Sequence, residues 1–157
     1  MNIQIRKAEI NDFAAVDSLL NLVHHLHCEN RPDVYKKVNH AYSEEDFEEL
    51  INNDNMIALL AEVDSIAVGL CIVTFRAPII SVLMTPRDVL YIEALSVKPE
   101  YRNCGIGKQL YLEVEKSAKE QGIKSIELKV WSFNETALRF YEEMGLKPQS
   151  IILEKTL

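Results

Sequence analysis

The stretch Tyr91-Ile-Glu-Ala-Leu-Ser-Val-Lys-Pro-Glu-Tyr-Arg-Asn-Cys-Gly-Ile-Gly-Lys-Gln-Leu110 decides the fold, because an apolar, strand-like run leads into a turn with two glycines that opens a helix. Gly105 and Gly107 lack a Cβ, so the backbone there can lie directly against a ligand, and the N–H groups of the first helical turn have no partner within the helix. These donors, the positive end of the helix dipole and the side chains of Arg102 and Lys108 together suit a phosphate or pyrophosphate group.

Two common phosphate-binding motifs do not fit this turn. A nucleotide P-loop requires G-x-x-x-x-G-K-[ST], but Lys108 is followed by Gln109, and no glycine precedes Gly107 by five residues. The dinucleotide fingerprint G-x-G-x-x-G requires a third glycine where this chain has Leu110. The pattern that remains is Arg102-x-x-Gly105-x-Gly107.

This pattern resembles the pyrophosphate loop, R/Q-x-x-G-x-G/A, of the GNAT family of N-acetyltransferases, which bind acetyl-coenzyme A. Upstream, the segment from Ile92 to Arg102 is similar to the fourth strand of that family with its Val-x-Pro-x-x-Arg exit. Downstream, residues 134–146 resemble the family's N-x-x-A-x-x-x-Y-x-x-x-G-F block, with Leu146 where Phe is usual. The resemblance is close over residues 88–148 and, in the order and spacing of elements, covers the whole chain.

The resemblance implies an α/β (α+β) fold, with a mixed, mostly antiparallel twisted sheet, one parallel and splayed strand pair, and helices on both faces. The residues predict the parallel pair as well, because a strand at 125–131 follows the strand at 89–97 only after a helix at about 105–121. Residues 1–157 are expected to form a single N-acetyltransferase domain, since the length is ordinary for one domain and the chain contains no linker or repeat.

Periodicity and turn residues predict the other elements. A first strand ends near Ala8, and an amphipathic helix begins at about Phe13 and must end before Pro32. Ser43 is expected to cap a helix that stops at Asn52. The remaining expected elements are strands at 56–63 and 66–75 joined by a two-residue turn, a bulge or close backbone approach at Gly69, a helix capped by Asn134, and a final antiparallel strand at 149–153.

Composition and charge narrow the class of protein. The net charge of −7 disfavours a nucleic-acid partner, since such proteins usually carry a basic stripe. No apolar run approaches the ~20 residues of a membrane span, and the N-terminus lacks a signal-peptide core. The three cysteines, Cys28, Cys71 and Cys104, form an odd set without C-x-x-C spacing, which favours reduced thiols. A cytoplasmic protein is therefore expected.

For the cofactor, the resemblance implies acetyl-coenzyme A as cosubstrate, with its pyrophosphate on the glycine turn. The family's splayed strands let the pantetheine arm pair with the backbone as an added strand would. A backbone N–H at or near Leu95 would then face the thioester oxygen. The residues expected to bind the cofactor are Leu95, Ser96, Val97, Arg102, Asn103, Cys104, Gly105, Ile106, Gly107, Lys108, Asn134 and Tyr141.

Glu93 and Tyr141 are the expected catalytic residues, again by resemblance. Glu93 lies four residues before Val97, as does a proposed base in some polyamine-type members, and a carboxylate can take the proton of the acceptor amine directly or through water. The alternative is that Glu93 only binds a cationic substrate or orients water. Tyr141 matches the family's tyrosine near the coenzyme A sulfur, where it can protonate the leaving thiolate, and the alternative is a tyrosine of the core.

The segment from His24 to Tyr35 leaves three interpretations open. His24, His27 and Cys28 could ligate a metal, but no further ligand is apparent and no metal site is expected. The segment could also be a polar helix end. By the resemblance it borders the acceptor pocket, so the candidate substrate-binding residues are His27, Arg31, Tyr35, Glu93 and Trp131.

The expected function is direct transfer of an acetyl group from acetyl-coenzyme A to a primary amine, with a small-molecule acceptor favoured. A protein N-terminal or lysine acetyltransferase and a non-catalytic acyl-coenzyme A-binding module are the alternatives, and the acceptor itself is not encoded in any motif. A homodimer is also expected, from the apolar patch Ile79–Met84 and the exposed edge of the terminal strand. The sequence leaves open whether residues 76–87 cover the active site, contact another subunit or extend a hairpin.

Overall fold

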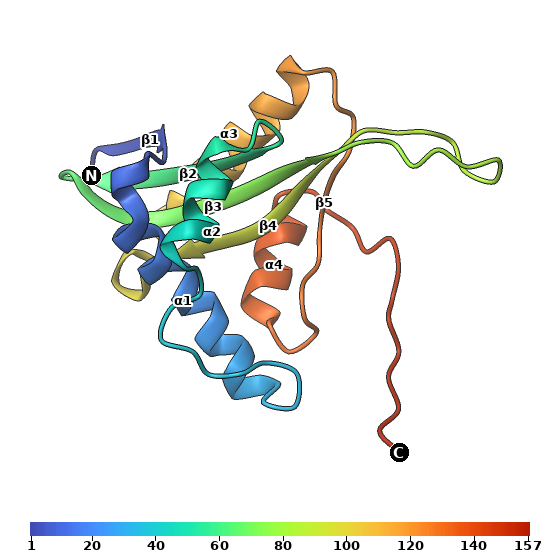
Figure 1. Cartoon of the computed structure of the whole chain (residues 1–157), viewed down its shortest axis with the longest axis horizontal. Coiled ribbons are helices and arrows are strands. Elements are labelled where there is room, and N and C mark those ends of the chain that lie inside the picture. The colour runs from blue at the N-terminus through green and yellow to red at the C-terminus, as the bar shows by residue number, and fades with distance from the viewer.

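A computed structural model describes residues 1–157, and Figure 1 shows a twisted sheet with helices on both faces. Short turns of 3-10 helix at Ile10–Asp12 and Pro99–Tyr101 precede α1 and the glycine turn. The elements are β1 (Ile3–Lys7), α1 (Phe13–Asn30), α2 (Glu44–Asn52), β2 (Met56–Val63), β3 (Ile66–Arg76), β4 (Val89–Val97), α3 (Ile106–Glu120), β5 (Ile126–Leu128) and α4 (Glu135–Glu143).

The sheet has the strand order β1-β2-β3-β4-β5, with β1 to β4 antiparallel and β5 parallel to β4. The predicted parallel pair, separated by a helix, is therefore confirmed. Its pairing is short, because only Leu90, Ile92 and the residue between them have partners in β5. β4 continues to Val97 while the chain after Leu128 leaves the sheet, so the two strands splay apart.

Two apolar cores hold the helices on the sheet, one on each face. The predicted mixed sheet with helices on both faces is confirmed. On one face α3 contributes Ile106, Leu110 and Val114, and Phe140 of α4 and the following Met144 pack at the margin. On the other face α1 and α2 contribute Val16, Leu19, Phe47 and Leu50.

The hairpin of β2 and β3 sets how closely α3 approaches the sheet. Its two-residue turn, Asp64-Ser65, has positive φ angles of 51° and 63°, as a tight hairpin turn of this length favours. Ala61 lies opposite Gly69, whereas Glu62 lies opposite Ala67, so the predicted bulge is present. A Cβ on Gly69 would lie 2.9 Å from Cγ2 of Ile106, which confirms the predicted close approach. Glycine here lets the start of α3, and the turn before it, lie against the sheet.

The predicted final strand at 149–153 is wrong. Residues 147–157, called here the terminal segment, have no regular secondary structure, and Figure 1 shows them running away from the sheet to the C-terminus. The side chains of Ile151, Ile152 and Leu153 have high strand propensity, but a strand also needs a neighbouring edge, and the chain brings none beside this segment. β5 is likewise shorter than predicted, because the splay removes its partner after Leu128.

Residues 77–88, called here the projecting hairpin, continue β3 and β4 beyond the body of the molecule (Figure 1). Ser81 and Met84 form an antiparallel bridge near the tip. Ile80, Val82 and Leu83 are almost fully exposed, so this apolar patch extends a hairpin and lies against solvent. No helix of the chain is both long enough and apolar enough to cross a membrane.

Candidate active site

The glycine turn forms an exposed stretch of backbone at the N-terminus of α3. Asn103 and Gly105 both have left-handed φ angles, 60° and 81°, and Gly105 is the N-cap of the helix. Residues 102–105 are exposed, and a Cβ on Gly105 would meet no protein atom within 4 Å. Successive N–H groups in such a turn point toward the same open space, where they can bind an anion.

The charges around this turn favour an anion. Lys108 is exposed in the first turn of α3, and that turn contains no acidic residue. Arg102 donates from Nε to the carbonyl oxygen of Val97 at 3.2 Å, which fixes its guanidinium between the end of β4 and the turn. The glycine turn therefore fits the pyrophosphate of coenzyme A in charge and in free space.

The opening between β4 and β5 exposes backbone groups of β4. Lys98 N donates to Val68 O in β3, and alternate residues of a strand direct their N–H and C=O groups to opposite sides. Ser96 therefore faces β3, whereas Leu95 and Val97 direct their backbone groups into the opening, where no strand accompanies β4. The Val97 carbonyl oxygen accepts from Arg102, and the other backbone groups of these two residues can pair with an extended ligand as with an added strand.

Glu93 lies at a bulge in β4. Val73 is opposite Ile92 and Ile72 is opposite Ala94, so Glu93 is the extra residue. Its carboxylate reaches Nη2 of Arg76 at 3.3 Å, and the Arg76 guanidinium lies 3.3 Å from the centre of the Tyr91 ring. Ala94 next to it packs with the core under α1 and α2, which places Glu93 toward that face of the sheet.

Tyr42, which precedes α2, is a neighbour of Glu93. Burial raises the pKa of the Tyr42 phenol, and the negative charges of Glu93 and Asp46 raise it further. Tyr42 therefore stays a neutral hydroxyl at neutral pH. No motif in the sequence pointed to Tyr42 or Arg76, since both reach Glu93 through tertiary packing.

Tyr141 lies on the opposite face of the sheet from Glu93. Burial raises the pKa of its phenol well above the usual range, with a further contribution from Cys71 and Tyr111, which belong to the core under α3. Cys71 lies opposite Leu95 in the sheet, so Tyr141 is close to the part of β4 that borders the opening. The two candidate proton carriers thus flank the splayed strands from opposite faces.

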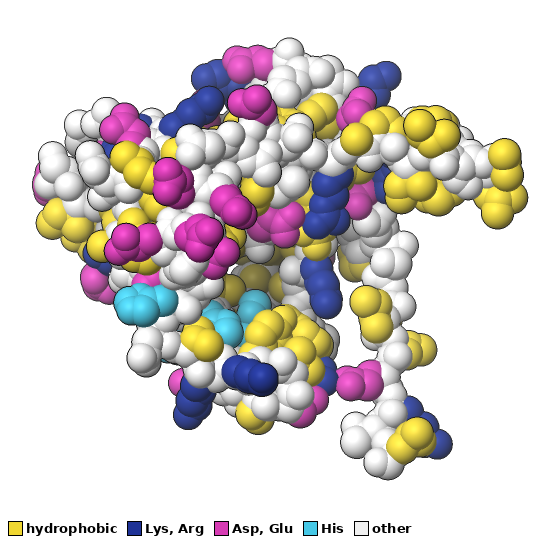
Figure 2. All heavy atoms as spheres, viewed as in Figure 1, with side chains coloured by type: hydrophobic (Ala, Val, Ile, Leu, Met, Phe, Trp, Pro, Cys, Tyr) yellow, Lys and Arg dark blue, Asp and Glu magenta, His cyan; other side chains and the backbone are white.

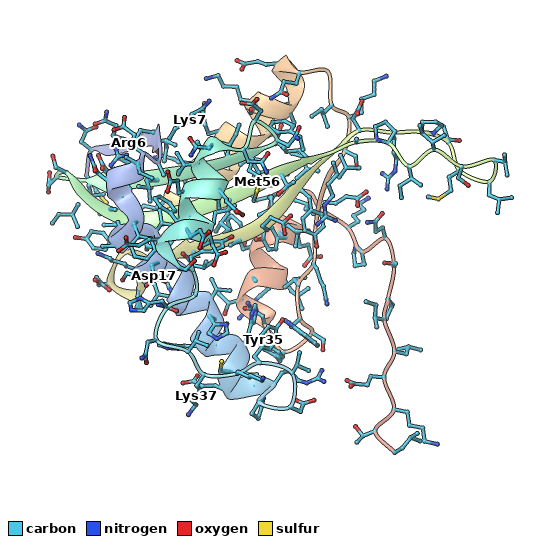
Figure 3. The ribbon with its side chains drawn as sticks, viewed as in Figure 1. Arg6, Lys7, Asp17, Tyr35, Lys37 and Met56 are labelled. Carbon is cyan, nitrogen blue, oxygen red and sulfur yellow. The ribbon has the colours of Figure 1, made fainter.

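An aromatic cluster connects the end of α1 with the chain that follows β5. Trp131 donates from Nε1 to the Tyr35 hydroxyl at 2.9 Å, and His27 stacks on Tyr35 with ring centres 4.8 Å apart. Phe133 stacks on Trp131 at 5.9 Å. Figure 3 shows Tyr35 in the connection after α1, on the side toward α4. The structure therefore brings together three of the candidate substrate-binding residues, His27, Tyr35 and Trp131, in one wall beside the opening.

Two cations flank this wall. The guanidinium carbon of Arg31 lies 4.8 Å from the centre of the Trp131 ring, and Lys129 Nζ lies 5.0 Å from it. Burial lowers the pKa of His27, and the nearby His24 and Lys129 lower it further, so the His27 ring is neutral at neutral pH. Sequence reasoning missed Lys129, which no motif marks.

His24 and Cys28 do not gather with His27. His24 Nε2 lies 3.3 Å from Cys28 Sγ, and both side chains contact the carbonyl oxygen of Lys36, while His27 turns to Tyr35. His24 and Cys28 therefore tie the connection after α1 to the helix. No three His, Cys, Asp or Glu side chains of the chain are placed to hold a metal ion together.

Asp17 holds the next part of that connection. Its buried carboxylate accepts from Ala41 N at 2.8 Å, from Tyr42 N at 3.3 Å and from His40 Nδ1 at 2.8 Å. Figure 3 shows Asp17 on α1 near the start of α2. An acidic residue on the buried stripe of an amphipathic helix was the available signal, because a buried carboxylate requires such partners.

Some expected cofactor-binding residues have other partners for their side chains. Ser96 Oγ donates to Leu19 O at 2.8 Å and is buried, and the Ile106 side chain is in the core under α3. Ile106 could therefore reach a ligand only through its backbone, whereas the backbone groups of Ser96 face β3 and its side chain faces α1. Asn134 accepts from Ala137 N at 3.1 Å, so the predicted cap of α4 is confirmed and its NH₂ group is left for another acceptor.

Comparison with known proteins identifies the family. Residues 20–146 match the acetyltransferase (GNAT) family. The chain belongs to this family. This confirms the resemblance drawn from the glycine turn and from residues 134–146.

Individual GNAT relatives match over different lengths. A crystal structure of a mutant of the BH1408 protein from Bacillus halodurans has a TM-score of 0.95 at 24% identity, covering 98% of this chain and 99% of that chain. The thialysine N-epsilon-acetyltransferase of Bos taurus is 36% identical over 56 residues, which are 36% of this chain and 33% of that protein.

The L-ornithine N5-acetyltransferase of Arabidopsis thaliana is 40% identical over 55 residues, which are 35% of this chain and 24% of that protein. This GNAT chain covers less than half the length of the curated relatives that it matches.

Proposed function

We propose that this GNAT protein is an acetyl-coenzyme A-dependent N-acetyltransferase that transfers an acetyl group directly to a primary amine of a small molecule. The observation that carries the proposal is the opening between β4 and β5, with the glycine turn at its end and Glu93 and Tyr141 on opposite faces of the sheet. Acetyl-coenzyme A, when bound, supplies the acetyl group as a thioester.

The residues of the chain divide the binding of the cosubstrate between them. The N–H groups of the glycine turn, with Lys108 and Arg102, hold the pyrophosphate. The backbone groups of Leu95 and Val97 pair with the amides of the pantetheine arm, and Leu95 N–H donates to the thioester oxygen as negative charge develops there. The NH₂ group of Asn134 is available to the same arm.

Glu93 accepts a proton from the acceptor amine, and Tyr141 supplies the proton that the leaving sulfur needs. The acceptor amine arrives as an ammonium ion, and Glu93 takes a proton from it, directly or through water, so that the nitrogen lone pair can form the new C–N bond. As the C–S bond breaks, Tyr141 donates its phenolic proton to the leaving sulfur. The second proton of the attacking nitrogen, released as the amide forms, returns through water to the Tyr141 oxygen. The raised pKa of Tyr141 keeps its phenolic proton on the oxygen until it is needed.

The aromatic wall of His27, Tyr35 and Trp131 is proposed to border the acceptor, with Arg31 at its edge. The wall includes Trp131, which lies in the chain after β5, where that chain diverges from β4. Relatives named for thialysine and L-ornithine support a small amine as the acceptor.

The test is acetylation of a panel of amines, followed by mass spectrometry of the products. The panel contains polyamines, diamino acids, aminoglycosides, a lysine peptide and peptides with free N-termini. We expect an acetylated small amine and a matching release of coenzyme A. Mass detection avoids thiol reagents, which would also modify the exposed Cys104.

Two other outcomes would replace the proposal. Products from peptides alone would make the protein a protein acetyltransferase. Binding of coenzyme A without acceptor-dependent turnover across the panel would make it an acyl-coenzyme A-binding module. Gly105→Val serves as the control that lacks the cofactor site.

A further inference from the structure

The chain after β5 brings Lys129 to the start of the opening, beside Glu93. The last paired residues of the two parallel strands are Ile92 and Leu128. Glu93 and Lys129 are the next residues along each chain, so a continuation of this register puts them next to each other where the strands begin to splay. A basic and an acidic side chain therefore enter the opening together, one from each side.

Lys129 lies on the α1 and α2 face of the sheet. Leu128 packs at the margin of the core under α3, and successive side chains of an extended chain point to opposite faces. Lys129 Nζ lies 5.0 Å from the centre of the Trp131 ring, and Trp131 Nε1 donates to the hydroxyl of Tyr35 in the connection after α1. The ammonium group is therefore on the same face as Glu93 and against the aromatic wall.

The arginine side chains around the opening already bind carboxylates. Arg31 binds two of them, at 2.7 Å and 3.0 Å, and Arg76 and Arg87 bind one each. Lys129 has no carboxylate partner, and its ammonium group contacts the ring of Trp131 instead. An ammonium group held over an aromatic ring keeps its N–H donors available for a ligand.

The charge at this place suits one kind of ligand group. Figure 2 shows Lys and Arg side chains along the hollow between the body and the terminal segment, below the projecting hairpin. The single unpaired charge of Lys129 matches a carboxylate, whereas a phosphate monoester carries close to two negative charges at neutral pH. A substrate that carries ammonium groups alone would place a second cation near Lys129, and like charges repel each other.

We propose that Lys129 binds the carboxylate of the acceptor, so that this site prefers an amino acid whose reactive amine is on the side chain. The inference rests on the proposed acetyl transfer at Glu93 and adds the group that selects the substrate. The side-chain ammonium of the substrate lies at Glu93, its carboxylate lies at Lys129, and the carbons between them lie along the ring of Trp131. Because hydrogen bonds between charged groups are strong, Lys129 holds one end of the acceptor while the other end reacts.

The test compares acceptors that differ in the carboxylate alone. Cadaverine is L-lysine without its carboxylate group, and putrescine is L-ornithine without it. The methyl esters of both amino acids keep the carbon skeleton and lack the negative charge. For the wild type we expect kcat/KM for at least one amino acid to exceed that for its diamine and its ester by about tenfold, the low end for a hydrogen bond to a charged group.

Lys129→Met removes the charge and keeps an unbranched side chain of similar length. We expect the preference for the amino acid over its diamine to fall about tenfold, through a higher KM for the amino acid, while kcat changes little. Lys129→Arg keeps a cation and should retain the preference. Lys124→Met is the matched control, because Lys124 is also exposed but precedes β5, and this variant should keep the preference of the wild type.

Calorimetric titration in the presence of coenzyme A measures the same preference without turnover. The wild type should bind the amino acid about tenfold more tightly than its diamine, and Lys129→Met should bind the two equally. Equal affinities in the wild type, or a preference that Lys129→Met retains, would overturn the inference even if every amine is acetylated. Absence of turnover with all amines would contradict the proposed function, and the titration would then still decide whether Lys129 binds a carboxylate.

Discussion

Glu93 points toward the α1 and α2 face because of one extra residue in β4. In a regular strand, side chains alternate between faces, but the bulge places Glu93 and Ala94 toward the same face. The bulge also determines that Leu95 and Val97, rather than Ser96, direct backbone groups into the opening. One irregularity thus positions both the proposed base and the proposed oxyanion donor.

Replacing Glu93 by Gln tests its role as base. Gln keeps the shape and removes the proton acceptor, so kcat/KM should fall on the order of 10²-fold, the low end for loss of a general base. Raising the pH should partly restore the rate, because it supplies free amine. The measurement is a pH–rate profile of both enzymes. A variant equally slow at every pH would make Glu93 a substrate-binding group.

Tyr141 is tested by removing only its hydroxyl. Tyr141→Phe should keep the packing of α4 and the affinity for coenzyme A while turnover falls. High pH should not restore it, since burial holds the pKa of this phenol above its ordinary value of about 10 and the lost proton donor has no substitute in solution. Turnover and coenzyme A affinity are measured side by side. Unchanged turnover would leave Tyr141 as a residue of the core.

The sequence could predict residues whose role depends on the conformation of their own backbone. It could not predict residues whose role depends on which distant residues the fold brings near them. Gly69 and Gly105 were foreseen because a missing Cβ is a local property, and the structure shows the close approach at one and the left-handed φ at the other. Arg76 contacts Glu93 across the β3–β4 pair, and Tyr42 lies within range of the Glu93 charge although it precedes α2. Both contacts need the three-dimensional fold.

At the level of elements, the glycine turn and the first turn of α3 are proposed to bind the pyrophosphate together. A substitution of Gly105 tests this proposal. Gly105 has φ +81°, where a branched residue is strained, and its Cβ would enter the space proposed for the pyrophosphate. Gly105→Val should therefore abolish the rise in melting temperature that coenzyme A gives the wild type.

Gly107→Ala is the matched control for this unit. A Cβ there would lie 3.5 Å from Phe140, an ordinary contact, so the thermal shift should persist. Both variants are compared in the same thermal-shift titration. A folded Gly105→Val protein that still responds to coenzyme A would contradict the assignment of the turn.

The connection between α1 and α2 is held by Asp17, and this carboxylate is tested by Asp17→Ala. Two backbone N–H groups and His40 would lose their acceptor, which should cost about 1–3 kcal/mol of unfolding free energy. Because Tyr42 would lose its position beside Glu93, the KM for the acceptor should rise while the KM for acetyl-coenzyme A stays constant. Equal changes in both KM values would show a general loss of structure instead.

Helices whose first residues carry a capping motif were predicted correctly. Strands whose existence depends on a neighbouring strand edge were not. α2 begins at Ser43 with the capping box that the sequence shows, and α4 begins at Asn134. The terminal segment has the composition of a strand, but whether it becomes one depends on an edge that no local pattern reveals. The same reason limits β5 to three residues.

At the scale of the whole molecule, the sheet with a core on each face follows from the order of strands and helices, but the acceptor wall follows from contacts between distant parts of the chain. His27 of α1, Tyr35 of the connection and Trp131 after β5 meet only in the folded protein. A change that weakens these contacts should therefore lower the free energy of unfolding of the whole chain.

Acid should weaken the fold through His27, because burial first, and then His24 and Lys129, hold the pKa of its ring below the ordinary value of about 6.5. A lowered pKa means that the unfolded chain binds the proton more readily, so this contribution to stability is present above pH 6.5 and is lost as the pH falls through the folded-state pKa. The hydrogen bond from Arg6 lowers the pKa of Asp12, so the stability that Asp12 contributes is lost only below about pH 4. This range does not overlap with the titration of His27.

His27→Phe keeps a ring on Tyr35 and removes the titration. We expect the unfolding free energy of the wild type, from chemical denaturation, to fall between pH 7 and pH 5 more steeply than that of the variant. Their difference should level off above pH 7, where His27 is neutral in both the folded and the unfolded chain. Parallel curves across this range would mean that His27 is solvated in the folded protein, and the aromatic wall would then be looser than the stacked rings indicate.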